Sequence, residues 1–364
     1  MENKNIWLTY SAEEKEELHK ICELYKSWLD KGKTERECVE LAVELAEKAG
    51  YHNLEEYLSE ERQIQKGEKI YAVCMKKCIV LFRMGAEPIS AGMNILGAHI
   101  DSPRIDIKQN PLYEKDDFTY LDTHYYGGIK KYQWVTQPLA LHGVVVKKDG
   151  SCVNISIGER EDEPVFVITD LLVHLASKQL EKKAGEVIEG EKLDILVGNC
   201  PIERDENLKE ERETVKANVL KILEEAYGIS EEDFASAELE IVPSGKARDI
   251  GFDRSMILAY GQDDRICAFT SIMAMLSVED SSRTACCLLV DKEEIGSVGA
   301  TGMHSRFFEN MVAELIALTE GESDIKVRRA LANSKMLSSD VSAAYDPQFE
   351  EVFEKRSAAY LAKG

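Results

Sequence analysis

The sequence predicts an α/β fold in which a mostly parallel mixed sheet is flanked by helices and interrupted by an inserted β-rich domain. Short apolar strands alternate with helix-like segments toward both ends of the chain, whereas the middle carries hairpin-like strands. The length of 364 residues favours two domains, or one domain with a large insertion. We expect one domain built from residues 1–103 and 247–364, and an inserted domain over 104–246.

The first 65 residues are expected to be mainly helical. Ser11 with Glu14, and Thr34 with Glu37, fit capping boxes, in which a hydroxyl and a carboxylate satisfy unpaired amides at a helix start. Gly50 is expected to end the second helix.

Alternating strands and helices then define the predicted sheet. The expected strands are 78–82, 93–98 and 285–290, and the expected helices after the insertion are 264–278 and 306–318. Sheets of this kind bind ligands beyond the carboxyl ends of their strands. His99 and the pair Glu293 and Glu294 lie at such ends.

The 104–246 block has a different pattern. Strands over 143–148 and 153–157 flank Asp149-Gly150, a dipeptide that tolerates positive φ and predicts a hairpin. Helices are expected over 170–183 and 206–227, the second densely charged.

Composition excludes several classes of partner. The net charge of −22 argues against nucleic acid and anionic membranes, which need clustered Lys and Arg. Neither a signal peptide nor an 18-residue apolar run is present, so a cytoplasmic location is expected. Cys74 and Cys78 could suggest a metal pair, but no second pair at zinc-finger spacing follows, and reduced thiols are the better interpretation of the nine cysteines.

Acidic and imidazole side chains follow five apolar or glycine-bearing segments. A hydrolase that needs hydroxide at neutral pH requires cations, and oxygen and imidazole ligands hold them. The side chains are those of His99 and Asp101, His174, Asp263, Glu293 and Glu294, and Asp340.

Each of these signals also has a structural interpretation. A His after a strand is often a satisfied structural residue, but Asp101 can accept the second ring N–H of His99 and so orient it toward a metal. Asp263 and Asp264 could simply cap the helix that follows. Glu293 and Glu294 could form a solvated turn, but directly after an apolar strand they would be costly without cations or partners.

Five ordered motifs give the chain a family resemblance. They are His99-Ile-Asp101-Ser-Pro, Tyr126-Gly127-Gly128, Asp263-Asp-Arg, Asp291-Lys-Glu-Glu-Ile-Gly-Ser297 and Ser339-Asp340. Together they resemble the aspartyl aminopeptidase and vacuolar aminopeptidase I family of dizinc metallopeptidases, over residues 11–364. The resemblance implies a zinc-peptidase-like fold with two zinc ions per subunit, manganese or cobalt being alternatives.

The resemblance also implies a ligand set. His99 and Asp340 would each bind a zinc ion, Asp263 would bridge both, and Glu294 would complete the set. Asp264 is the alternative bridge, one residue away in register. Related dizinc peptidases hold the bridging Asp with a cis peptide on its carboxyl side, so we expect a cis bond between Asp263 and Asp264.

Three further roles follow from the same resemblance. Glu293 would be the general base, and Asp101 would orient His99. The family supplies a histidine from a neighbouring subunit, and His174 matches that motif, although a simple interface histidine is the alternative. The inserted domain would then serve dimerisation, within a tetrahedral dodecamer built from dimers.

Two departures from the family pattern stand out. The family has a further zinc-binding histidine near its carboxyl terminus, and no His follows His304 here, so we expect either a fragment of a longer chain or a lost ligand, the fragment fitting better. Residues 131–134 read Lys-Tyr-Gln-Trp where the aspartyl branch has Trp-Phe-Asp-Arg, which weakens any inference of acidic-residue preference.

The predicted function is therefore removal of amino-terminal residues from peptides by a cytoplasmic dizinc aminopeptidase. The alternative from another class is a non-catalytic oligomeric peptide-binding or assembly protein that kept the fold, and the presence of Glu293 favours the enzyme. A related dizinc peptidase or deacylase with another lid domain is a further rival, against which the 104–246 block argues.

Overall fold

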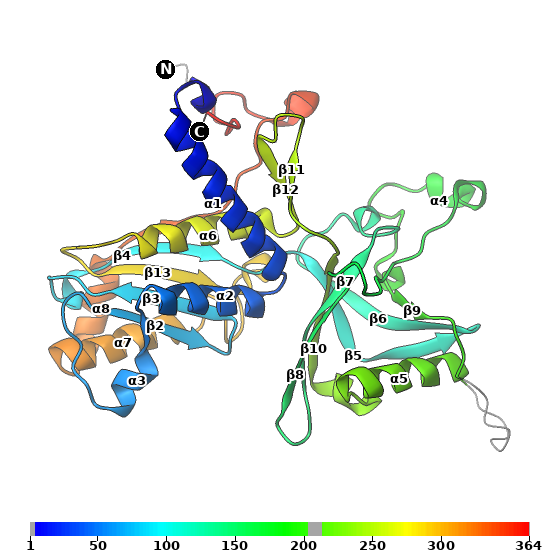
Figure 1. Ribbon diagram of the computed structural model, residues 1–364, viewed down its shortest axis with the longest axis horizontal. Coiled ribbons are helices and arrows are strands. Elements are labelled where there is room, and N and C mark those ends of the chain that lie inside the picture. The colour runs from blue at the N-terminus through cyan, green and yellow to red at the C-terminus, as the bar shows by residue number, and fades with distance from the viewer. Residues whose placement is uncertain (1–3, 203–212, 364) are drawn as a thin grey trace. The chain divides into compact units, whose positions relative to one another are not determined.

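The computed structural model describes residues 4–202 and 213–363 (Figure 1). Contacts divide the chain into two units. The first unit comprises Met1–Asp101, Ala247–Glu293 and Ser297–Gly364, and the second comprises Ser102–Lys246 with Glu294–Gly296.

The first unit is built on a six-stranded sheet with the order β1-β2-β3-β13-β4-β14. The strands are β1 (His52–Asn53), β2 (Lys69–Cys74), β3 (Cys78–Arg83), β4 (Asn94–His99), β13 (Ala285–Val290) and β14 (Lys335–Ser338). β13, β4 and β14 run parallel, as do β1 and β2, whereas β3 is antiparallel to both of its neighbours. The predicted mixed, mostly parallel sheet is confirmed, and the three predicted strands form within one residue of their expected bounds.

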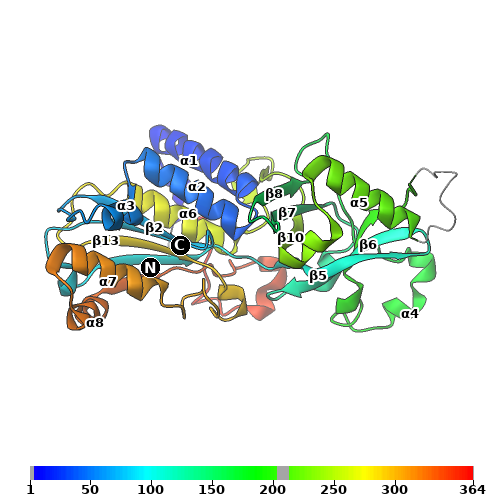
Figure 2. The same ribbon diagram turned by 90° about the horizontal axis from the view of Figure 1, so that it is seen from below.

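Helices cover both faces of this sheet, as Figure 2 shows for α1 and α2 on one side and α7 and α8 on the other. One core cluster joins α1 (Ala12–Lys31), α2 (Glu35–Lys48) and α6 (Gln262–Leu276) to the sheet. The second cluster joins α3 (Leu54–Ser59), α7 (Phe307–Glu320) and α8 (Asp324–Asn333) to the opposite face. The alternation of a strand explains this division, because Cys287 and Leu289 lie in the first cluster and Cys286 and Leu288 in the second.

Both predicted capping boxes are present. Glu14 N donates to Ser11 Oγ (3.2 Å) while Ser11 N donates to Glu14 Oε2 (2.8 Å), and Thr34 and Glu37 make the equivalent pair. α2 ends at Lys48, and Gly50 takes a positive φ of 84° just beyond it.

The second unit contains a six-stranded antiparallel sheet with the order β8-β7-β10-β5-β6-β9. Its strands are β5 (Arg104–Lys115), β6 (Phe118–Tyr126), β7 (Leu139–Val146), β8 (Cys152–Ile157), β9 (Ile195–Gly198) and β10 (Ala237–Pro243). The predicted hairpin is confirmed as β7 and β8, with Gly150 at a φ of 83° in the turn. α5 (Thr214–Tyr227) packs on β5, β6 and β9.

Two helix predictions in this unit need correction. The helix expected over 170–183 is wrong: only the 3-10 turn η4 (Val173–Leu175) and the single-turn α4 (Ser177–Leu180) form. The apolar side chains there are exposed, so the segment has no buried face to stabilise a longer helix, Ala176 apart. The helix expected over 206–227 begins at Thr214, and residues 206–212 lie outside the described part of the chain.

Shorter elements complete the described chain. They are η1 (Ile6–Leu8), η2 (Ile89–Ala91), η3 (Lys131–Gln133), η5 (Gly190–Lys192), η6 (Glu231–Ser236), β11 (Arg248–Ile250), β12 (Met256–Leu258), η7 (Glu293–Ile295) and η8 (Pro347–Val352). Among the described residues, no helix has both the length and the apolar character that a membrane crossing requires.

Candidate metal centre

The parallel strands of the first unit bring several of the predicted site residues together at the carboxyl ends of these strands. His99 is the last residue of β4, Asp340 follows β14 by two residues, and Glu293 follows β13 by three. Because these three strands are adjacent and parallel, their carboxyl ends meet. Asp263 reaches these carboxyl ends from the first turn of α6.

Three carboxylates surround one imidazole nitrogen. His99 Nε2 lies 3.3 Å from Asp263 Oδ1, 3.8 Å from Glu293 Oε2 and 4.0 Å from Asp340 Oδ1. Ligand atoms of His99, Asp263 and Asp340 all lie within 4.8 Å of one another. Imidazole and carboxylate ligands bind zinc at roughly 2.0–2.2 Å, so these atoms are within reach of one cation or of two neighbouring cations.

The opposite side of the His99 ring is fixed by Asp101. His99 Nδ1 lies 3.2 Å from Asp101 Oδ1 and 3.0 Å from the Asp101 backbone oxygen. Both are acceptors, so Nδ1 carries a ring hydrogen, and once Nε2 has lost its proton its lone pair is directed toward the three carboxylates. Asp101 is fully buried, which keeps this arrangement away from water.

The environment of His99 demands a positive charge. Its Nε2 is buried and has no hydrogen-bond partner among the residues that the structure describes. Burial lowers the pKa of His99, but the hydrogen bond with Asp101 and the nearby carboxylates outweigh burial and raise the pKa to about 9. A proton on Nε2 would balance the negative charge of these carboxylates, and a metal cation bound there would do the same. The residues therefore fit a zinc site.

The two adjacent aspartates differ in their surroundings. The peptide bond between Asp263 and Asp264 is cis, as predicted. The Asp263 side chain is 57% exposed and faces His99, whereas Asp264 is fully buried and its pKa is raised to about 6, mainly by burial. Of the two, Asp263 is the one that groups with His99 and Asp340.

Glu293 is tied to the same centre through its backbone. Glu293 N donates to Asp101 Oδ1 (3.2 Å), so a single carboxylate oxygen holds both the His99 ring and the main chain of Glu293. The Glu293 side chain is 46% exposed, and it can therefore meet both a water molecule and a substrate.

Two predicted site residues belong to the second unit. Glu294 lies against Gly127, where an added Cβ would stand 3.2 Å from Glu294 Oε2, so the Tyr126-Gly127-Gly128 segment leaves room for this carboxylate. His174 lies in η4 and is exposed. The group of His99, Asp263 and Asp340 contains neither residue, and their predicted roles stay predictions.

One part of this region was not predicted from the sequence. Asp291 is fully buried directly after β13, and Lys77 from the turn between β2 and β3 lies beside it. The only signal was the acidic first residue of Asp291-Lys-Glu-Glu, directly after an apolar strand.

Comparison with known proteins decides the family. The family model described as "Aminopeptidase I zinc metalloprotease (M18)" matches residues 28–364. The chain belongs to this family.

Relatives of this M18 chain cover its whole length. A probable M18 family aminopeptidase 1 from Clostridium acetobutylicum is 56% identical over 363 residues, covering 100% of this chain and 77% of that protein. The crystal structure of an M18 aminopeptidase from Thermotoga maritima matches with a TM-score of 0.93 at 40% identity, over 100% of this chain and 78% of that one. The yeast aminopeptidase 1 structure, at 21% identity and a TM-score of 0.74, shares the fold over 94% of this chain and 76% of that one.

Family membership confirms the predicted class of enzyme. The M18 chain is a zinc-dependent metallo-aminopeptidase, and the comparisons support this function over the non-catalytic alternative. The resemblance found in five short motifs therefore extends over residues 28–364.

Proposed function

We propose that this M18 aminopeptidase hydrolyses the amino-terminal peptide bond of peptides at a site for two zinc ions held by His99, Asp263, Glu294 and Asp340. Manganese or cobalt would be alternative ions. The observation that carries the proposal is the buried Nε2 of His99, which faces three carboxylates and has no hydrogen-bond partner among the described residues. When bound, zinc supplies an acidified water molecule and stabilises negative charge on the substrate carbonyl.

The protein's own residues divide the remaining work. Asp263, which faces His99, would bridge the two metals, while Asp340 and Glu294 would complete their coordination. Asp101 holds the ring hydrogen of His99 and so keeps Nε2 directed at the site. Glu293 would take a proton from the attacking water and deliver it to the leaving amine. Its partly exposed carboxylate, 3.8 Å from His99 Nε2, supports this role.

Assembly is part of the proposal. We infer a homo-oligomer, a tetrahedral dodecamer built from dimers, in which the inserted 104–246 domain forms the dimer contact and His174 serves a neighbouring subunit. The exposed apolar side chains around His174 support an interface there: Leu171, Leu172, Val173, Leu175 and Leu180. A solved S. cerevisiae mApe1 structure of the same fold is a dodecamer.

The compartment is proposed on chemical grounds. All nine cysteines are free, and Cys38, Cys78, Cys286 and Cys287 are buried. Free thiols are typical of a reducing compartment, so we place the enzyme in the cytoplasm.

Adjacent carboxylates allow a matched test of the mechanism. We expect Glu293→Gln to keep zinc content nearly intact while turnover falls at least about a hundredfold, because the amide cannot take a proton. Glu294→Gln should instead lower the zinc content, because an amide is a poorer ligand than a carboxylate. Zinc is measured by metal analysis of the purified protein, and turnover with a panel of aminoacyl-p-nitroanilides. Ordinary turnover in zinc-loaded Glu293→Gln would remove the base assignment.

The bridge is tested separately. Asp263→Ala should release both metals together, because a bridging ligand contacts two cations. Retention of one full zinc equivalent with the affinity of the unsubstituted protein would contradict the bridge.

A further inference from the structure

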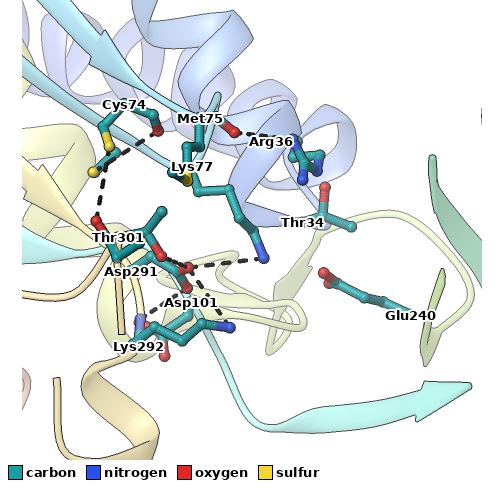
Figure 3. Close-up of polar contacts among 12 residues, drawn as sticks. Thr34, Arg36, Cys74, Met75, Lys77, Asp101, Glu240, Asp291, Lys292 and Thr301 are labelled. Atoms are coloured by element: carbon teal, nitrogen blue, oxygen red, sulfur yellow. Dashed lines mark hydrogen bonds and ion pairs between the residues drawn. The ribbon is translucent and has the colours of Figure 1, made fainter. Parts of the chain in front are cut away.

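The loop that carries Glu293 is closed at its base by one buried side chain. Asp291 Oδ1 accepts a hydrogen bond from Lys292 N (2.8 Å), and Asp291 Oδ2 accepts one from Thr301 Oγ1 (2.6 Å). Asp291 N also donates to the backbone oxygen of Thr301 (3.4 Å). Asp291 is fully buried, so these bonds join the two ends of the 291–301 loop inside the protein (Figure 3).

Buried charged groups surround Asp291. Lys77 Nζ lies 3.7 Å from Asp291 Oδ2, and the Lys77 side chain is only 7% exposed. Glu35, at the start of α2, is fully buried nearby, and burial together with this second carboxyl raises the pKa of Asp291. Burying ionisable groups is costly unless they are paired and hydrogen-bonded. None of these three residues has a task in the mechanism above, so their burial needs another explanation.

A second contact joins the loop to the hairpin formed by β2 and β3, which also carries Lys77. Cys74 Sγ, at the end of β2, lies 3.8 Å from the backbone oxygen of Ala300, and Lys77 comes from the turn that follows this strand. Figure 3 shows Cys74 and Lys77 directed from the hairpin toward Thr301 and Asp291. The carboxyl end of the loop is therefore fastened both to Asp291 and to the hairpin.

The path from Asp291 to the metal centre is short. Lys292 takes a positive φ of 71°, and the next residue, Glu293, donates its backbone N–H to Asp101, which also holds His99. The Glu293 main chain is thus fixed between two buried aspartates, Asp291 on one side and Asp101 on the other. An error of about 1 Å in the placement of a catalytic group can reduce turnover about a hundredfold.

We propose that Asp291, held by Thr301 and Lys77, is a positioning residue that fixes the Glu293 carboxylate relative to the metal ligands. The inference rests on the proposed role of Glu293 as general base. The buried cluster of Lys77, Asp291 and Glu35 would then contribute to catalysis by holding the 291–301 loop in place, and it would not bind metal.

Thr301 offers the cleanest substitution. Thr301→Val keeps the volume of the buried side chain and removes the hydroxyl that donates to Asp291, whereas Thr301→Ser keeps the hydroxyl and loses only a methyl group. The matched control is Thr119→Val in β6, because Thr119 is also buried and its hydroxyl has no hydrogen-bond partner within the described ranges. Asp291→Asn and Lys77→Met provide independent variants should Thr301→Val fold poorly.

The experiment compares kcat, KM, zinc content and amide hydrogen exchange of residues 292–300 in the zinc-loaded full chain. For Thr301→Val we expect kcat to fall about tenfold or more, since a hydrogen bond to a charged group is lost. KM and zinc content should change less than about twofold, and exchange of the loop amides should increase. Thr301→Ser should restore kcat to within about threefold, and Thr119→Val should leave it unchanged.

Three results would overturn the proposal. They are an unchanged kcat in both Thr301→Val and Asp291→Asn, an equal loss in Thr301→Val and Thr301→Ser, or a loss of kcat that merely follows loss of zinc. Glu293→Gln, measured in parallel, separates this failure from failure of the proposed function. If Glu293→Gln is inactive while Thr301→Val and Asp291→Asn are both fully active, the base stands and the positioning role does not.

Discussion

Replacing Asp101 separates the charge of this residue from its hydrogen bonds. Asp101 Oδ1 accepts both from His99 Nδ1 and from Glu293 N, each at 3.2 Å. Asp101→Asn retains an oxygen that can accept these bonds but removes the negative charge, whereas Asp101→Ala removes both. Comparison of the two variants therefore reports what each property contributes to zinc binding and turnover.

The structure sets the expected magnitudes. A hydrogen bond to a charged group contributes about 1.5–3 kcal/mol and a neutral one about 0.5–1.5 kcal/mol, so Asp101→Asn should lose about 1–2 kcal/mol of support for His99. Zinc affinity should fall about tenfold. In Asp101→Ala the backbone oxygen of residue 101, 3.0 Å from His99 Nδ1, still accepts the ring hydrogen. We therefore expect its loss of affinity to stay within about a hundredfold, the upper end for the partner of a metal-bound histidine.

Competition with a chelator of known affinity measures the zinc dissociation constant, and kcat is then measured at saturating zinc. Asp101→Ala should have a lower kcat than Asp101→Asn, because Glu293 N has lost its acceptor as well. Wild-type zinc affinity in Asp101→Ala would refute the assignment of Asp101 as the residue that orients His99. A loss beyond about a thousandfold in both variants would show that the backbone oxygen does not share the ring hydrogen.

Two further predictions concern stability and assembly. Arg265 is almost fully buried and donates to the backbone oxygens of Ile100 (3.3 Å) and Lys33 (2.9 Å). Arg265→Met should therefore lower the free energy of unfolding, measured by urea denaturation, by about 2–4 kcal/mol. A loss below about 1 kcal/mol would contradict this prediction. Mixing His174→Ala subunits with Glu293→Gln subunits should restore part of the activity, because some mixed interfaces would pair an intact metal site with an intact histidine. Full activity of a dilute His174→Ala monomer would exclude the shared site.

Local sequence signals predicted most of the first unit. The Ser11 and Thr34 capping boxes and the apolar run of β13 depend on residues close together in the chain, and each formed where expected. The order of the strands could not be predicted from such local signals. β3 lies antiparallel between β2 and β13. Its pairing with β13 joins residues about 200 positions apart in the chain, and no local pattern contains such a pairing.

The wrong helix over 170–183 has a different cause. Helical stability comes mainly from burying an apolar face, and the side chains of Leu171, Leu172 and Leu175 in this segment are 53–67% exposed. Sequence patterns show that a segment can be amphipathic, and they do not show whether another surface covers it. Exposed leucines of this kind are typical of an interface with another chain.

The candidate site divides its carboxylates in a way that only the fold could show. Asp263, Glu293 and Asp340 are 57%, 46% and 58% exposed and can receive a cation, water and substrate. Asp101 and Asp291 are fully buried, and each accepts a backbone N–H of the 291–301 loop.

The sequence uses carboxylates both for the exposed groups that can receive a cation and for the buried groups that hold the loop, and it places the two kinds close together. Spacing alone could therefore not distinguish a metal ligand from a supporting residue. Burial separates them, because a desolvated carboxylate is stabilised by fixed donors, and a carboxylate open to solvent can still exchange water for a metal ion. The two buried aspartates therefore account for how a loop containing two glycines and two adjacent glutamates can hold the proposed base in one position.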